Sequence, residues 1–481
     1  MATVTGEKTV PLAIGGALVP GAAGTYPVAN PADPDEVVLA APAASSGQLD
    51  QAVAAARGAQ AGWHDMGFDA RLAAVQSACD RAQESIGLEA TSELLTREHG
   101  KILVEALFDL ATTAGMVAAL APLAAEVLEP RSVGGSVVER VPHGVVAAVL
   151  PFNWPAAVMG NKVLPALLTG NTVVVRAPPS CPGAVLTLVG AIASGLPAGV
   201  LNTLNGPAGD LGAALVGHAD VDMVTFTGGV STGAAVMAAC APHLRPVVLE
   251  LGGNDAAIVA PDLEPTGELA DRLLEAAFVT SGQVCMAIKR LYIPSGRQHE
   301  WREVLAAALS RSVVGDGLDP EVTMGPVHTR SARDRVEAMI AEAAARGAEV
   351  VRPATVIDPG SGWRVSPALV IDPDPGTSLV RDEQFAPALP VLPYATMDGA
   401  VEAANDSGFG LCASVWSDDL AMADAVAHRL MAGTVWVNAH GMGAMDHLAP
   451  MGGWGRSGLG VELGVEGMAA LTRPRAQRGP R

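Results

Sequence analysis

The stretch Val145-Val146-Ala147-Ala148-Val149-Leu150 begins a regular alternation of apolar runs and helical patterns that continues to residue 251. Further Val-rich runs occupy 172–175, 223–226 and 247–251. Stretches with helical periodicity separate them, at 156–168, 184–194 and 209–217. Because strands that alternate with helices form parallel sheets covered on both faces, this pattern predicts a doubly wound α/β sheet.

A second α/β series follows residue 253. Its strand-like runs lie at 256–259, 291–293, 349–352 and 434–437, and its helical patterns at 266–278, 300–310 and 329–345. Ahead of the first sheet, helical periodicity dominates 49–63 and 70–120, after a Gly- and Pro-rich segment at 15–34 that we expect to be extended. The chain has 481 residues. Single cores stop growing at ~250–300 residues, so we expect two α/β domains.

Composition narrows the possible partners and the compartment. The formal net charge of -20 disfavours binding to nucleic acid or to anionic lipid. The five cysteines form no C-x-x-C pair, which argues against disulfides or a zinc site and favours a reducing cytoplasm. His440 and His447 match no metal-ligand spacing, so no metal is expected. We also expect neither a signal peptide nor a membrane span.

Three polar residues lie in segments where their side chains could take part in a reaction. Cys285 follows a Gly-Gln turn, where its thiol can be exposed, although most lone cysteines are buried structural residues. Glu250 ends an apolar strand, where burial would raise the carboxyl pKa toward general-base duty; a helix cap or an ion pair is the alternative. Asn153 follows the strand at 145–150 and offers an amide to an oxyanion, or simply makes a turn.

Taken together, these segments resemble the aldehyde dehydrogenase superfamily. The matching motifs are Pro151-Phe152-Asn153-Trp154-Pro155, Leu249-Glu250-Leu251-Gly252-Gly253 and Gly282-Gln283-Val284-Cys285. The similarity extends to 226–228, 382–387 and 457–464, and spans roughly residues 10 to 470 in the family's order. It implies NAD(P)-dependent oxidation of an aldehyde to a carboxylic acid.

The resemblance also assigns residues to the reaction. Cys285 would form a thiohemiacetal and then a thioester, Glu250 would activate the hydrolytic water, and Asn153 would hold the oxyanion together with the Cys285 backbone N–H. Lys162 and Glu462 match positions that the family uses for proton relay or orientation. Taken as isolated residues, both would be read as surface charges.

For the cofactor, NAD or NADP, the resemblance implies a site built at several motifs. Glu383 and Phe385 match the clamp on the nicotinamide ribose, and the turn with Gly228, Gly229 and Gly233 matches the pyrophosphate site. Phe152 and Leu251 belong to the same expected lining. The family usually has K-P-(S/A)-E where this chain has Arg176-Ala177-Pro178-Pro179. Because Arg176 offers a fork suited to phosphate and Pro179 replaces a carboxylate, NADP becomes more plausible than usual.

The aldehyde tunnel is expected to be mostly apolar. By family position its lining comprises Trp154, Val158, Asn161, Val284, Met286, Met445 and Met451. This set favours a hydrophobic or aromatic aldehyde. Two alternatives stay open: a CoA-acylating enzyme of the same fold, disfavoured by Glu250, and a degenerate binding protein without turnover.

The expected architecture has three parts. Residues 1–122 and 143–252 form a dinucleotide-binding domain, residues 253–456 form a catalytic domain, and 123–142 with 457–481 form a small β oligomerisation arm and a C-terminal tail. By resemblance, such an arm implies a homodimer or homotetramer.

Overall fold

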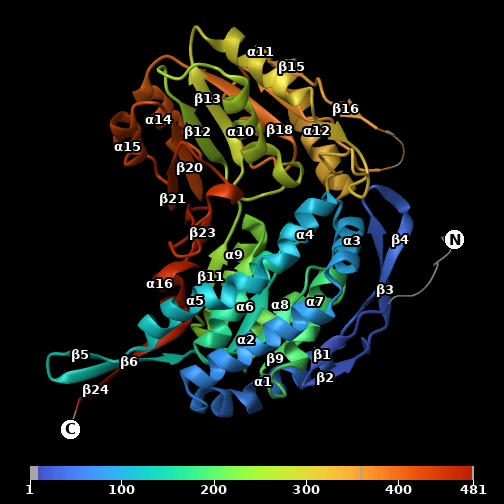
Figure 1. The fold of residues 1–481 in the computed structure, drawn as a ribbon, viewed down its shortest axis with the longest axis vertical. Coiled ribbons are helices and arrows are strands. Elements are labelled where there is room, and N and C mark those ends of the chain that lie inside the picture. Colours follow the sequence, from blue (N-terminus) through green and yellow to red (C-terminus); the bar gives the residue numbers. More distant parts are fainter. Residues whose placement is uncertain (1–8, 358–359, 361, 479–481) are drawn as a thin grey trace.

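Two α/β lobes make up the body of the molecule, one above the other in Figure 1. The computed structural model describes residues 9–357, 360 and 362–478. Residues 1–8 of the expected first domain and 479–481 of the expected tail lie outside this described part. Each lobe contains one mainly parallel sheet with helices packed on its faces.

The first sheet has the order β23-β11-β10-β7-β8-β9 and is parallel except for its edge strand β23. The four predicted strands are confirmed as β7 (Val145–Val149), β8 (Thr172–Arg176), β10 (Met223–Thr227) and β11 (Val247–Glu250). The sequence pattern missed β9 (Leu201–Leu204), because Asn202 and Thr203 interrupt its apolar run. Both are buried, and their side chains accept hydrogen bonds from the backbone N–H groups of Gly15 and Ala13.

Helices cover this sheet on both faces. The intervening segments form α6 (Pro155–Leu168), α7 (Gly183–Ser194), α8 (Asp210–Gly217) and α9 (Val230–Cys240), as predicted for the first three. The N-terminal helices are α1 (Ser46–Asp65), α2 (Phe68–Ser85), α3 (Leu88–His99), α4 (Leu103–Ala111) and α5 (Thr113–Leu128). The expected extended entry instead forms two hairpins, β1 (Leu12–Ile14) with β2 (Ala17–Val19), and β3 (Thr25–Asn30) with β4 (Asp33–Pro42).

The second sheet has the order β15-β17-β18-β13-β12-β20-β21. Its predicted strands are β12 (Asp255–Val259), β13 (Ile288–Pro294), β15 (Glu349–Val351) and β21 (Thr434–Val437). The pattern missed β17 (Ala368–Ile371), β18 (Ala388–Tyr394) and β20 (Cys412–Trp416). Pro390 and Pro393 lie inside β18, and proline counts against a central strand because it cannot donate to the ladder.

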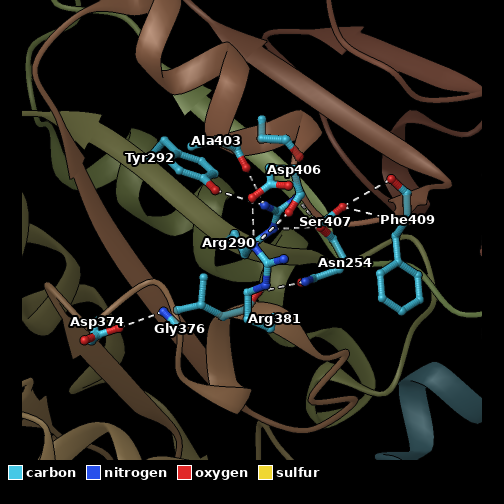
Figure 2. Close-up of polar contacts among 12 residues, drawn as sticks. Asn254, Arg290, Tyr292, Asp374, Gly376, Arg381, Ala403, Asp406, Ser407 and Phe409 are labelled. Atoms are coloured by element: carbon cyan, nitrogen blue, oxygen red, sulfur yellow. Dashed lines mark hydrogen bonds and ion pairs between the residues drawn. The ribbon is translucent and has the colours of Figure 1, made fainter.

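The helices of the second lobe include the three that were predicted. They are α10 (Gly267–Phe278), α11 (Gln298–Leu309), α12 (Arg330–Ala345), α13 (Ser378–Arg381), α14 (Met397–Asn405) and α15 (Leu420–Ala427). The short pair β14 (Val313–Val314) and β16 (Thr355–Val356) lies beside them. A buried cation, Arg290 of β13, joins this sheet to α14 by donating to the carbonyl oxygens of Ala403 and Ala404 and to the Tyr292 hydroxyl (Figure 2).

The projecting arm is a three-stranded antiparallel sheet of β5 (Arg131–Val133), β6 (Ser136–Pro142) and β24 (Thr472–Arg478) (Figure 1). The structure differs from the expected boundaries at both ends. Residues 123–128 complete α5, and the chain after residue 457 first returns to the body. There β23 (Gly458–Leu459) pairs with β11 and α16 (Gly464–Ala470) packs on α5. Residues 457–470 therefore belong to the body, and only β24 of the expected C-terminal segment joins the arm.

One stretch, 103–128, is long and apolar enough to cross a membrane by length and composition. In the structure it is divided into α4 and α5, and α5 packs against α2, α6 and α16. Core helices of globular proteins pass the same test, so the stretch is weak support for a span. The expectation of no membrane span remains a prediction.

Candidate active site

The predicted motifs converge on one cleft of about 280 Å³ between the lobes. Parallel strands expose their carboxyl ends at one edge of a sheet, and the segments after β7, β10 and β11 meet the Cys285 loop there. Eight predicted residues line the cleft: Phe152, Asn153, Gly228, Gly229, Leu251, Cys285, Glu383 and Phe385. Their convergence from distant parts of the chain makes this cleft the candidate active site.

The loop that carries Cys285 has an unusual backbone. After α10, Thr280 and Ser281 adopt φ values of 53° and 56°, and Gly282 follows at 71°. Two contacts hold this left-handed segment: the Thr280 N–H donates to Glu105 Oε1 at 2.6 Å, and the Ser281 hydroxyl donates to the Gly325 carbonyl at 2.7 Å. Residues in such conformations persist only where the surroundings over-determine them, and they cluster at functional sites.

Cys285 is partly exposed to the cleft, and Asn153 lies beside its loop. Asn153 Nδ2 donates to the Gln283 carbonyl at 2.9 Å, a bond that uses one of the two amide hydrogens. Burial raises the pKa of the Cys285 thiol to about 12; the nearby Lys289 charge opposes this rise, and the carboxylates of Glu383, Asp255 and Glu250 add to it. Burial therefore opposes formation of the thiolate, and the Lys289 charge favours it.

Glu250 ends β11 at the predicted position and is 7% exposed. Its Oε1 has no hydrogen-bond partner among the described residues. Burial first, and then the charge of Glu462, raise the pKa of this carboxyl well above its usual range, while Lys162 lowers it. A buried carboxyl with a raised pKa and a free oxygen has the properties of a general base.

Lys162 is buried and Glu462 is partly buried, so reading Lys162 as a surface charge would be wrong. Lys162 is 1% exposed and donates to Glu462 and, at 2.9 Å, to Thr225 Oγ1. The Thr225 hydroxyl in turn donates to Glu462 Oε1 at 2.8 Å. The three side chains form a closed buried network whose charges reach Glu250.

The residues that resemble a pyrophosphate site form an open helix end. Helix α9 begins after Gly229 and has no side-chain cap, and a Cβ at Gly229 would meet no atom within 4 Å. By contrast, a Cβ at Gly233 would lie 2.4 Å from Leu251 Cδ2, so this glycine allows the helix to pack closely. The open N–H groups at the helix start, facing the cleft through Gly228 and Gly229, fit a phosphate group.

Glu383 and Phe385 also fit the expected cofactor. Glu383 Oε1 accepts a hydrogen bond from the Gly253 N–H at 3.1 Å, and a Cβ at Gly252 would lie 2.1 Å from Glu383 Oε2. Glycine at 252 is therefore required for the carboxylate to lie here. Phe385 has a φ of 48°, and its ring meets that of Phe152 edge-on at 5.9 Å. The carboxylate and the rings suit a ribose and a nicotinamide.

Arg176 does not offer the phosphate fork that the sequence suggested. The side chain is 4% exposed, and its guanidinium donates to Asn205 Oδ1 at 3.1 Å and to the carbonyls of Ala177, Gly206 and Pro207. Burial lowers the pKa of Arg176 to about 10. The guanidinium points inward and is bonded to these oxygens at the ends of β8 and β9, so its donors are not free for a phosphate. The argument from Arg176 for NADP is therefore wrong. The Pro179 carbonyl accepts from the Tyr26 hydroxyl at 2.7 Å.

An apolar cluster flanks Cys285 on the side expected for the aldehyde. It contains the predicted Trp154, Val158, Val284, Met286, Met445 and Met451, together with the unpredicted Ala157, Val279, Ala287, Leu411, Cys412, Trp436 and Met442. Phe108 of α4 is 57% exposed and meets the Trp154 ring edge-on at 5.9 Å. Asn161 lines a small cavity with Lys162 and Glu462, and its place in the aldehyde tunnel stays a prediction.

Several site residues escaped sequence reasoning. The Phe152 ring is stacked on His328 at 4.5 Å and on His99 at 5.7 Å. The backbone N–H of His328 donates to Gln283 Oε1 at 2.9 Å. Burial lowers the pKa of His328 to about 4, so the imidazole is neutral. Arg335 of α12 lines the cleft and donates to the Glu383 carbonyl at 2.9 Å. His99, His328 and Arg335 are isolated polar residues in the sequence, and no motif around them indicated these contacts.

A buried ion pair supports the segment that follows Asn153. Lys101 Nζ lies 3.0 Å from Asp109 Oδ2 and 3.9 Å from the centre of the Trp154 ring. Asp109 Oδ1 accepts a hydrogen bond from the Ala157 N–H at 2.8 Å, in the first turn of α6. No group of three potential metal ligands occurs within the described residues, and His440 Nδ1 lies 2.8 Å from Ser414 Oγ.

Comparison with known proteins identifies the family. Residues 18–476 match the model of the aldehyde dehydrogenase family. The chain is 40% identical to geranial dehydrogenase from Castellaniella defragrans over 73% of both chains. This protein therefore belongs to the aldehyde dehydrogenase family.

Solved structures agree over nearly the whole chain. A cysteine-to-alanine mutant of aldehyde dehydrogenase C from Pseudomonas syringae, in complex with NAD+ and octanal, superposes with a TM-score of 0.92 at 32% identity, covering 99% of this chain and 98% of that one. An NADP-dependent enzyme from E. coli gives 0.91 at 29% identity, covering 98% of both. The predicted fold class, the activity class and the use of NAD or NADP are confirmed.

Proposed function

We propose that this enzyme oxidises a hydrophobic aldehyde to its acid through a thioester on Cys285. The observation that carries the proposal is the position of Cys285, which borders both the cleft with Glu383 and Phe385 and the apolar cluster with Trp154. A thiol in that position can meet a cofactor on one side and an apolar substrate on the other.

The proposed roles follow from the chemistry of each group. The Cys285 thiolate forms a bond to the aldehyde carbon, and the carbonyl electron pair moves onto oxygen, where Asn153 Nδ2 and the Cys285 N–H donate to it. The cofactor supplies a hydride acceptor next to this carbon. Glu250 then removes a proton from the water that cleaves the thioester, and the network of Lys162, Glu462 and Thr225 tunes or relays that proton.

We propose that residues lining the cleft contact the cofactor. Phe152, Gly228, Gly229, Leu251 and Glu383 would hold the pyrophosphate and the nicotinamide riboside, with Phe385 beside the ring. With Arg176 turned inward, the described residues favour neither NAD nor NADP.

A long or branched apolar aldehyde suits the pocket best. The cluster brings Trp154 and Trp436 together with four Met residues, whose flexible side chains can adapt to irregular shapes. Two similar proteins point the same way, since one is named for geranial and the other was solved with octanal.

We also propose that the enzyme is a cytoplasmic homodimer or homotetramer that binds neither membranes nor nucleic acid. The net charge of -20 and the free state of Cys79, Cys181, Cys240, Cys285 and Cys412 support these expectations. The projecting arm suits contact with a second copy (Figure 1). Light scattering on purified enzyme would give a dimer or tetramer mass, and a monomer would contradict the proposal.

The test is absorbance of reduced nicotinamide with octanal, geranial, benzaldehyde and succinic semialdehyde, each with NAD and NADP. We expect turnover of the apolar aldehydes, and loss of more than about 10⁴-fold in Cys285→Ala. Cys79→Ala, a buried cysteine of α2, is the matched control and should keep full activity. Preference for the semialdehyde would contradict the substrate class, and product formation only with added CoA would indicate the acylating alternative.

A further inference from the structure

Lys289 is a buried cation without a carboxylate partner. It lies on β13, four residues after Cys285, and is 1% exposed. The other two lysines in the described part of the chain, Lys101 and Lys162, pair with Asp109 and Glu462. No such pair within 4.0 Å is found for Lys289 among the described residues. An unpaired buried charge is costly, so its position calls for a physical reason.

The ammonium group of Lys289 donates a hydrogen bond to the Val284 carbonyl oxygen. This carbonyl and the Cys285 N–H belong to one peptide unit, which is planar and trans. The oxygen and the hydrogen of a trans peptide point in opposite directions. The Val284 oxygen also accepts a hydrogen bond from the Ala287 N–H at 3.2 Å. The cation adds a charged donor to this bond, so it helps to hold the Cys285 N–H pointing away from Lys289 and polarises that N–H as a donor.

We propose that Lys289 is a positioning residue for the reaction: its ammonium group orients and polarises the Val284–Cys285 peptide so that the Cys285 N–H donates to the oxyanion. The inference rests on the function proposed above. When the Cys285 Sγ–carbon bond forms, the carbonyl electron pair moves to oxygen, and that oxygen needs donors already in place. Lys289 acts through this peptide and does not itself touch the substrate.

The same charge also acts on the thiol. Lys289 lowers the pKa of Cys285, against burial and against the carboxylates of Glu383, Asp255 and Glu250. Lys289 is thus the cation that favours the thiolate in a site where three acidic groups oppose it. Its charge would stabilise both the nucleophile and, through the peptide, the developing oxyanion.

The next residue on β13 provides a matched contrast. Arg290 is also buried and points to the other face of the sheet, where its guanidinium bonds the carbonyls of Asn254, Ala403 and Ala404 and the Tyr292 hydroxyl (Figure 2). Side chains at successive strand positions face opposite ways. Arg290 therefore serves as a structural cation that is adjacent in sequence but separate from the Val284–Cys285 peptide.

The experiment compares Lys289→Met, Lys289→Arg and Arg290→Lys in the full-length enzyme. Alkylation of Cys285 by iodoacetamide is followed by intact mass between about pH 7 and 10, where its rate reports the thiolate fraction. Cys285→Ala shows the background from the other cysteines. Steady-state kcat and KM with octanal and thermal unfolding are measured in parallel.

Lys289→Met should slow alkylation about tenfold at each pH and lower kcat at least tenfold, with the KM for cofactor nearly unchanged. Lys289→Arg should recover much of both losses, and Arg290→Lys should lower the unfolding temperature without slowing alkylation. The proposal is overturned if Lys289→Met lowers only the unfolding temperature, or if Arg290→Lys slows alkylation equally. Because alkylation requires no turnover, failure of this inference remains distinguishable from inactivity toward aldehydes.

Discussion

The cleft around Cys285 and the end of β8 differ in how their polar groups are used. Around Cys285, the side chains of Asn153, Glu250 and Glu383 keep hydrogen-bonding capacity that the protein itself does not consume. At the end of β8, Arg176 is bonded by carbonyl oxygens. Pro179, where the family has a carboxylate, has no side-chain acceptor at all.

This difference shows that a reaction site and a binding site place different requirements on their polar groups. A reaction site needs donors and acceptors that are held in place but left free, because charge develops there only in the transition state. A site that only holds part of a ligand can change its contacts, since backbone groups and shape can replace one side chain. We therefore expect substitutions near Cys285 to act on kcat and those near Arg176 to act mainly on stability.

The largest effect is expected for Glu250→Gln. Loss of the base should lower steady-state turnover by about 10²–10⁴-fold while leaving a burst of reduced nicotinamide equal to the enzyme concentration. In the native enzyme the base acts only when ionised, and its pKa is raised by burial and by Glu462, so kcat should fall as the pH drops through that raised pKa. The variant should lose this pH dependence.

Stopped-flow and steady-state assays across the pH range measure both effects. Glu268→Gln, an exposed glutamate of α10, is the control and should behave as the native enzyme. Unchanged turnover in Glu250→Gln would show that another group activates the water.

An intermediate effect is expected for Glu383→Gln. Removing the charge weakens the contact to ribose hydroxyls, so the KM for cofactor should rise about tenfold, to the same extent for NAD and NADP, because the nicotinamide ribose is common to both. Initial rates with each cofactor provide the measurement, with Glu402→Gln of α14 as an exposed control. A rise confined to NADP would place Glu383 near the other ribose.

The smallest kinetic effect is expected for Arg176→Met. Because the guanidinium bonds carbonyl oxygens of the chain, the ratio of kcat/KM for NADP and NAD should change by less than about threefold. Leaving those carbonyls without donors should instead destabilise the fold by about 1–3 kcal/mol. Cofactor kinetics and urea unfolding test this. A tenfold loss specific to NADP would mean that Arg176 turns outward to bind the 2'-phosphate.

The amino-acid sequence by itself determined the class of fold, the family and the order of the motifs. Local patterns sufficed because the strands of the first sheet are continuous apolar runs and because Asn153, Glu250 and Cys285 each sit in a short recognisable segment. The predicted roles of these residues rest on the same motifs, and the variants above test those of Glu250 and Cys285. Strands with polar or proline residues, such as β9 and β18, were missed because only their neighbours make them strands.

Only the tertiary structure decided which way the side chains face and what they bind. The predicted phosphate contact of Arg176 was wrong because its guanidinium bonds Asn205 and the Gly206 carbonyl, just after the neighbouring strand β9. These groups compete with any ligand for its donors. The role of Lys289 depends on its bond to the Val284 carbonyl and on the lack of a carboxylate within ion-pair distance among the described residues, which no sequence pattern shows. The Arg176 contacts to Asn205 and Gly206 span 29 and 30 residues within the first lobe, and Lys289 bonds a carbonyl five residues earlier in its own segment. The apolar periodicity of the sequence encodes neither contact.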